Sequence, residues 1–196
     1  IKCFNIESPA ELDRIANTAR NLGLKAHISV RVNPNIDAHV DHHVATGLGD
    51  SKFGVKLTDV IALYQKAAEL KEIEIEGISC HIGSLVESTA PYMSEIEVLS
   101  VFVNELLDRG IALKHFDIGG GAGVAYKADE KTLEPSELIP AVVAQIRSLV
   151  KIPDIEILIE PGRSIIAQAG VLLTRVEYLK SGLFERNFCV VDASMT

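Results

Sequence analysis

The chain has 196 residues and a formal net charge of −8 with no basic patch, so we expect no nucleic-acid partner. Its length suits one domain with a sizeable core, and no apolar run approaches the roughly 20 residues that span a membrane. The three cysteines, at positions 3, 80 and 189, lie in apolar runs without metal-ligand spacing, which predicts reduced, buried thiols in a cytoplasmic protein.

The start of the chain predicts a strand, a helix and a second strand. Residues 2–6 form the first predicted strand. Ser8-Pro9-Ala10-Glu11 is a capping box with proline at the first helical position, and the helix that it opens ends at Gly23. Residues 26–32 predict the second strand, and residues 33–56 predict a long loop, a type of segment that is usually functional or disordered.

The predicted loop contains His39, His42 and His43, which raises the question of a metal. No carboxylate lies at a helical offset from them, and free histidines in loops are commoner than histidine ligands. We therefore expect no metal site.

Strands and helices continue to alternate through the rest of the chain. Helices are predicted at residues 58–70, 96–107 and 138–149, and strands at residues 73–80, 114–118, 155–159, 171–179 and 188–191. This alternation predicts parallel strands with right-handed crossovers, which a TIM-like barrel and an open doubly wound sheet both satisfy. The glycine run lacks the dinucleotide spacing G-x-G-x-x-G, so we favour the barrel, of which about five of eight units are visible.

Three motifs follow predicted strands, at the end where either fold places its active site. Residues 119–123 read Gly-Gly-Gly-Ala-Gly. Such a run can turn successive N–H groups toward a phosphate, although many glycine-rich turns are only turns. We expect Asp117, before the run, to order the loop through backbone N–H groups rather than to act as a base.

His81 and Glu160 end two of the other predicted strands. His81, with Ser84 shortly after it, either lays a flat ring against a planar ligand or is a histidine at the edge of the core that bonds to backbone. Glu160 either forms a salt bridge with Arg163 or meets a cationic heterocycle while Arg163 meets an anion. A flat ligand with a phosphate at one end and a basic ring nitrogen at the other describes pyridoxal phosphate, whose protonated ring withdraws electrons from a substrate carbanion.

The motifs His-Ile-Gly-Ser, Asp-Ile-Gly-Gly-Gly and Glu-Pro-Gly-Arg-Ser, with Val-Asp-Ala near the end, together resemble the fold-type III decarboxylases that use pyridoxal phosphate. Residues 45–54 and 172–178 are similar to the members of that family that act on diaminopimelate. The resemblance covers essentially the whole chain. Two residues depart from it: Leu85 stands where a polar residue, often Gln, is expected, and Ser194 stands where Gly or Ala is usual.

The resemblance implies an α/β fold, a partial (β/α)8 TIM-like barrel of the alanine racemase type. It would occupy residues 1–180, and residues 181–196 would lead into a C-terminal β domain outside this chain. The first strand or strands, with the Schiff-base lysine, would lie upstream, and the acid cysteine would come with the β domain. We therefore expect an internal piece of a longer polypeptide that is inactive alone and forms a homodimer when complete.

By the same resemblance, His81 stacks on the cofactor ring and Glu160 pairs with the ring nitrogen, and both are predicted to be catalytic. Arg163 is the predicted substrate residue, contacting either a substrate carboxylate or the phosphate. The implied reaction removes carbon dioxide from the D-configured centre of meso-2,6-diaminopimelate and gives L-lysine, the last step of lysine biosynthesis. The predicted cofactor-binding residues are His81, Ser84, Gly119, Gly120, Gly121, Glu160, Pro161, Gly162 and Arg163.

Other readings of the same motifs stay open. One is a decarboxylase of ornithine, arginine or carboxynorspermidine on the same fold. Another is a non-catalytic relative that keeps the barrel and serves as a binding partner. An amino-acid racemase of this fold type would place an arginine on the ring nitrogen, so Glu160 argues against that reading.

Overall fold

The computed structural model describes residues 1–196 except 39, 41–45, 50, 128, 131, 184–185 and 194–196. The three loop histidines discussed above lie outside the described residues. The chain separates into two compact units, Ile1–Ser164 and Ile165–Thr196, which are described one at a time. Among the described helices, none combines the length and apolar character needed to cross a membrane.

The larger unit contains a parallel sheet whose strand order follows the chain. The strands β1 (Phe4–Ile6), β2 (Ala26–Asn33), β4 (Ile73–Ser79), β5 (His115–Asp117) and β6 (Glu156–Leu158) lie side by side in this order, and the short β3 (Val55–Lys56) pairs with β2. An open doubly wound sheet reverses its strand order at a switch point, and this sheet does not. The order therefore confirms the partial barrel over the doubly wound alternative.

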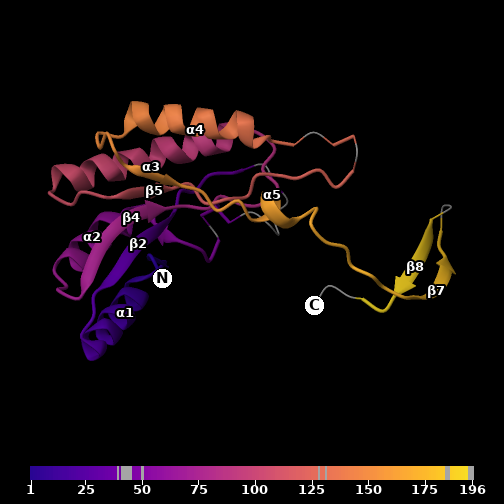
Figure 1. Ribbon diagram of the computed structural model, residues 1–196, viewed down its shortest axis with the longest axis horizontal. Coiled ribbons are helices and arrows are strands. Elements are labelled where there is room, and N and C mark those ends of the chain that lie inside the picture. Colours follow the sequence, from indigo (N-terminus) through magenta and orange to yellow (C-terminus); the bar gives the residue numbers. More distant parts are fainter. Residues whose placement is uncertain are drawn as a thin grey trace. The chain divides into compact units, whose positions relative to one another are not determined.

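Helices supply the crossovers between these strands. They are α1 (Pro9–Leu22), α2 (Val60–Ala68, after the 3-10 turn Leu57–Asp59), α3 (Ala90–Asp108) and α4 (Pro135–Leu149). The last two run side by side along the sheet (Figure 1), and α2 packs against α3 as α3 packs against α4. Neighbouring helices therefore form a continuous layer, as on the outside of a β/α barrel.

The core lies between this helical layer and one face of the sheet. Alternate strand residues such as Ile28, Val30, Ile78 and Phe116 are fully buried there with the apolar side of α3. Because successive side chains of a strand point to opposite faces, the residues between them face the other side, which is the barrel interior. These residues are largely polar: His27, Ser29, Arg31, Ser79, His115 and Asp117.

The ends of α1 match the sequence signals. The Ser8 hydroxyl accepts the N–H of Glu11 at 3.2 Å, and Gly23 ends the helix in the left-handed region with φ of 64°. In contrast, α3 begins at Ala90, well before the predicted residue 96, because Pro91 can occupy the first turn and Tyr92 adds to the buried face. The short α5 (Gly162–Ile166) is not predicted from the sequence.

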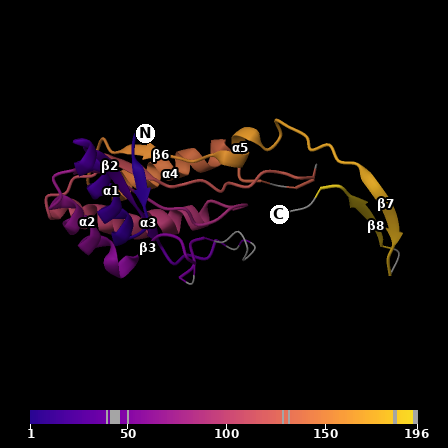
Figure 2. The ribbon, with the colours of Figure 1, turned by 90° about the horizontal axis from the view of Figure 1, so that it is seen from below.

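The smaller unit holds an antiparallel hairpin of β7 (Val176–Ser181) and β8 (Asn187–Val191), which run side by side in Figures 1 and 2. The prediction of a strand from residue 171 is wrong for its first five residues, because pairing with β8 begins at Val176. The prediction of three buried thiols is also wrong: Cys80 is buried, whereas Cys3 is partly exposed and Cys189 is exposed.

Candidate active site

The three sequence motifs lie at one edge of the sheet. His81 stands two residues beyond β4, Gly119 two beyond β5 and Glu160 two beyond β6. Because β4, β5 and β6 are parallel neighbours, the segments that follow them leave the sheet at the same edge. The structure thus brings together the histidine, the glycine run and the acidic motif.

Hydrogen bonds join these three segments. The N–H of Gly120 donates to Nδ1 of His81 at 3.2 Å, and the N–H of Glu160 donates to the carbonyl oxygen of Gly119 at 2.7 Å. Oδ1 of Asp117 accepts the N–H of Gly119 at 2.8 Å. This last bond confirms the prediction that Asp117 orders the loop through a backbone N–H group.

The three consecutive glycines at residues 119–121 leave no room for a side chain. A Cβ on Gly120 would overlap the carbonyl oxygen of Glu160, and a Cβ on Gly121 would overlap that of Gly83. Gly119 and Gly121 also have φ angles of 65° and 98°, which side chains other than hydrogen disfavour. The packing of the loops against one another therefore requires these glycines whether or not a phosphate binds.

Two of the three N–H groups in the predicted phosphate site are engaged inside the protein. Those of Gly119 and Gly120 bind Asp117 and His81, whereas that of Gly121 has no partner among the described residues. Ser84 is half-buried, and Arg163 is exposed in the first turn of α5. The groups available to an anion are therefore the Gly121 N–H, the Ser84 hydroxyl and the Arg163 guanidinium.

His81 presents a neutral ring of fixed orientation. Burial lowers its pKa, and the charges of Arg31 and Arg163 lower it further. Since Nδ1 accepts the N–H of Gly120, the ring proton lies on Nε2. A neutral, oriented imidazole is suited to packing against the face of a flat heterocycle.

Glu160 lies beside a second carboxyl group. Burial raises the pKa of Glu160, the charge of Asp117 raises it further, and Arg31 partly opposes both effects. Burial likewise raises the pKa of Asp117, although the N–H of Gly119 opposes this. Arg163 has no part in the shift of Glu160, and no ion pair joins these two described residues. The salt-bridge reading of Glu160 and Arg163 is therefore wrong.

Sequence reasoning misses Arg31, which belongs to this site. Its Nη1 donates to Oε1 of Glu7 at 2.7 Å from the middle of β2. Its charge acts on the pKa values of both His81 and Glu160. The available signal was the one arginine in a largely buried strand, where a charge needs a partner.

The described part of the predicted long loop packs onto the histidine motif. The N–H groups of Thr46 and Gly47 both donate to the carbonyl oxygen of Ile82, at 3.2 and 3.1 Å. The Thr46 hydroxyl donates to the carbonyl oxygen of His81 at 2.7 Å. The loop is therefore part of the framework that holds His81.

A small apolar cavity lies behind the glycine run, between Tyr92, Gly120 and Pro161. Its volume is about 50 Å³. Small-molecule sites occupy at least about 300 Å³, so this cavity is too small to hold a cofactor.

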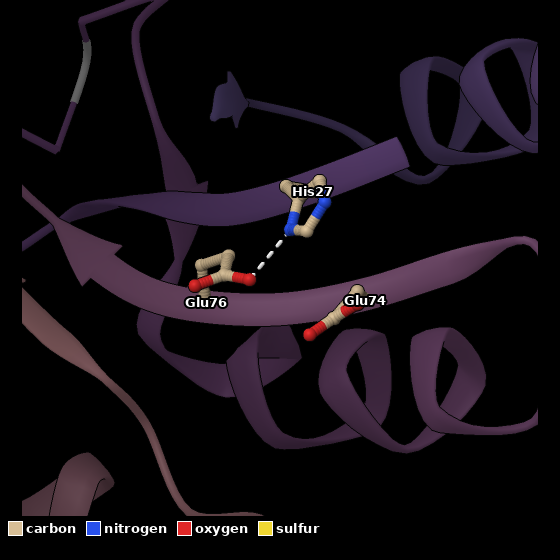
Figure 3. A group of neighbouring side chains, drawn as sticks. All are labelled: His27, Glu74 and Glu76. Carbon is tan, nitrogen blue, oxygen red and sulfur yellow. Dashed lines mark hydrogen bonds and ion pairs between the residues drawn. The ribbon is translucent and has the colours of Figure 1, made fainter. Parts of the chain in front are cut away.

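A second polar cluster lies toward the opposite, amino-terminal ends of the strands (Figure 3). His27 of β2 and Glu74 and Glu76 of β4 have ligand atoms within 4.8 Å of one another, and His27 Nδ1 lies 2.6 Å from Glu76 Oε1. Nζ of Lys114 donates to both carboxylates, at 2.7 and 2.8 Å. Because an ammonium group already supplies the cation, we interpret this cluster as an ion-pair network rather than a metal site.

The chain is similar to known proteins along its whole length. Residues 1–167 match the family model described as "Pyridoxal-dependent decarboxylase, pyridoxal binding domain". The chain is 42% identical over 195 residues to the diaminopimelate decarboxylase of Pseudomonas aeruginosa, a match that covers 100% of this chain and 46% of that protein. The chain therefore spans about half the length of the curated relatives it matches.

Solved structures show the same fold. Diaminopimelate decarboxylase from Helicobacter pylori, complexed with L-lysine, matches with a TM-score of 0.84 and 36% identity over 96% of this chain and 46% of that one. Lysine decarboxylase from Selenomonas ruminantium matches with a TM-score of 0.75 and 26% identity over 97% of this chain and 46% of that one.

Proposed function

The chain belongs to the pyridoxal-dependent decarboxylases, and from this premise we propose that it forms most of the cofactor-binding barrel of an enzyme that converts meso-2,6-diaminopimelate to L-lysine and carbon dioxide. The similarity to diaminopimelate decarboxylases at 42% identity supports the substrate. The observation that carries the proposal is the carboxyl group of Glu160 at the same strand edge as the neutral ring of His81.

The residues at this edge fit pyridoxal phosphate. The neutral His81 ring offers a flat surface, and the Glu160 carboxyl is a hydrogen-bond partner for a basic ring nitrogen. The N–H of Gly121 and the Ser84 hydroxyl are donors for a phosphate. When bound, pyridoxal phosphate supplies an electron sink for the carbanion that loss of carbon dioxide leaves behind.

Glu160 and His81 would then have separate tasks. An ionised Glu160 holds a proton on the ring nitrogen, which strengthens the electron-withdrawing effect of the ring. His81 holds the ring plane in place, and the bond from Gly120 prevents the imidazole from rotating. We assign both residues as catalytic, because both would touch the cofactor.

Arg163 would bind an anion. Its guanidinium is a cation, and its side chain is exposed at the start of α5. Its partner is either a substrate carboxylate or the cofactor phosphate. Arg163→Lys would separate the two, because loss of a bidentate substrate contact raises KM, whereas loss of a phosphate contact weakens cofactor binding.

We propose that the whole protein is a cytoplasmic homodimer, with residues 1–180 in the barrel and 181–196 leading into a further β domain. These assignments rest on the resemblance to the family. Light scattering of the purified full-length protein would check the dimer.

The test of the activity is carbon dioxide release by the full-length protein with bound cofactor. We expect the highest kcat/KM for meso-diaminopimelate among a panel that includes lysine, ornithine, arginine and carboxynorspermidine. Lysine belongs in the panel because a lysine decarboxylase shares the fold. A different best substrate would overturn the substrate assignment, and no release from any would favour a non-catalytic binding protein.

A further inference from the structure

Asp117 and Glu160 are fixed to the same residue. Asp117 ends β5, and its Oδ1 accepts the N–H of Gly119 at 2.8 Å. Glu160 follows β6, and its N–H donates to the carbonyl oxygen of Gly119 at 2.7 Å. Asp117 is in register with Leu158, two residues before Glu160, so the two acids lie on the same face of the sheet.

This geometry places the two carboxyl groups side by side, and each acts on the pKa of the other. Asp117 is 5% exposed, whereas Glu160 is exposed, so water screens the pair from the side of Glu160 only. Ionising both carboxyl groups is unfavourable, because their charges repel and the buried one, Asp117, is poorly solvated. A single proton shared between them satisfies the geometry.

The surrounding charges do not replace that proton. Arg31 acts on Glu160 from β2, but its guanidinium is bound to Glu7. Asp117 faces His115 of its own strand, and burial lowers the pKa of His115, which favours the neutral ring. Asn5 in β1, Cys3 before it and Glu95 in α3 also interact with Asp117, and none of them is a cation.

We propose that Asp117 is a positioning residue that shares one proton with Glu160, and that the pair passes this proton to the basic ring nitrogen of the heterocycle that binds there. The inference rests on the proposed function, since it takes that heterocycle to be a pyridine ring against Glu160. In the transfer a carboxyl O–H bond breaks, and the lone pair of the ring nitrogen forms the new N–H bond. The pair goes from one negative charge to two, and the ring gains one positive charge.

A simpler role for Asp117 is to cap the N–H of Gly119 and nothing more. The two roles differ in the source of the ring proton. If the pair supplies it, binding of an unprotonated ring takes no proton from solvent. If Asp117 and Glu160 are both ionised before binding, each binding event takes one proton from solvent.

The experiment uses the full-length apoprotein and a pyridoxal phosphate analogue in which a methyl group replaces the aldehyde, so that no covalent bond forms. Binding is measured by calorimetry in two buffers of different ionisation enthalpy, above the pKa of the free ring nitrogen. We expect wild type to take up about zero protons per ligand, and Asp117→Asn to take up about one, because that variant keeps the oxygen that accepts the Gly119 N–H but cannot hold the proton. Equal uptake by the two proteins overturns the inference.

A measurement on wild type alone covers the case in which Asp117→Asn does not fold. On ligand binding, the infrared difference spectrum should show the loss of the C=O stretch of one protonated carboxyl group. If binding causes no such loss, the inference is overturned. Different results would contradict the proposed function. In that case wild type would not bind the analogue, or Glu160→Gln would leave the absorbance band of the bound, protonated ring unchanged.

Discussion

The hydroxyl of Tyr92 donates to the carbonyl oxygen of Gly120 at 3.0 Å and so joins helix α3 to the centre of the glycine run. Tyr92 is 1% exposed, and burial raises its pKa, so the hydroxyl keeps its proton and acts as a donor at neutral pH. Because Gly120 also donates to His81, this one bond supports the residue that orients the imidazole ring.

Tyr92→Phe should lower the free energy of unfolding by about 1 kcal/mol, the typical net value of such a hydrogen bond, because the ring stays packed while the Gly120 carbonyl loses its partner. Cofactor affinity should fall as well. Urea denaturation and a cofactor titration measure the two effects. Tyr126→Phe is the control, because Tyr126 is 66% exposed and should change neither. Unchanged cofactor affinity in Tyr92→Phe would show that the glycine run holds its shape without α3.

Glu160→Gln should lower the turnover of the full-length enzyme by at least about a hundredfold while the cofactor stays bound, because an amide cannot hold a proton on the ring nitrogen. Glu156→Gln is a matched control on the same segment, since Glu156 is exposed and its side chain pairs with Lys2 at the protein surface. Steady-state kinetics with a cofactor absorbance measurement checks both. Turnover near the wild-type value in Glu160→Gln would show that Glu160 is not the partner of the ring nitrogen.

Gly120→Ala should destabilise the protein by about 1–3 kcal/mol, because the added methyl group overlaps the Glu160 carbonyl oxygen and two loops must separate. Gly162→Ala is the comparison, since a Cβ there meets nothing within 4 Å. Neither glycine has a positive φ, so the comparison isolates steric overlap from backbone strain. Equal midpoints in thermal unfolding would mean that the loops can move apart at little cost.

Glu95 should make stability depend on pH. It is fully buried in α3, and neither oxygen has a hydrogen-bond partner of ordinary geometry among the described residues. Burial raises its pKa well above the usual value, and the neighbouring thiol of Cys80 opposes this only in part. The folded state therefore keeps a proton that the unfolded state loses above its ordinary pKa. The contribution of Glu95 to the free energy of unfolding is fully present below the pKa of the unfolded state. It falls as the pH rises toward the pKa of the folded state, by about 1.4 kcal/mol per pH unit.

Glu95→Gln removes this titration, so the variant should gain stability relative to wild type at that slope as the pH rises from about 5 to 8. Urea denaturation across this range gives the difference between the two proteins, in which the other titrating groups cancel. Glu97→Gln, exposed on the same helix, should run parallel to wild type. A Glu95→Gln curve that also ran parallel would mean that Glu95 ionises in the folded state.

The features that the sequence predicts well are those set by local patterns. The cap at Ser8, the stop at Gly23 and the strand ends before His81, Gly119 and Glu160 all follow from residues adjacent in the chain. Strand order also confirms the partial barrel, because alternating strands and helices leave few topologies open.

The features that the sequence leaves unresolved depend on which side chains meet across strands. Arg163, three residues from Glu160, is the obvious local partner, but the structure places Asp117 from the neighbouring strand there instead. Arg31 and Glu7 likewise meet across 24 positions of the chain. Such pairs follow from strand register, and no periodicity within one segment specifies register.

The bonds from Thr46 and Gly47 to the carbonyl oxygen of Ile82 join the loop to the segment after β4 across 36 and 35 positions of the chain. Neither segment can open without breaking the same two bonds, so the two should exchange their amide hydrogens as one cooperative unit. Protection at Thr46 and Gly47 therefore reports the integrity of the His81 segment from outside it. A substitution in the loop that lowered the protection of these two amides from hydrogen exchange would disturb the His81 imidazole without contacting it.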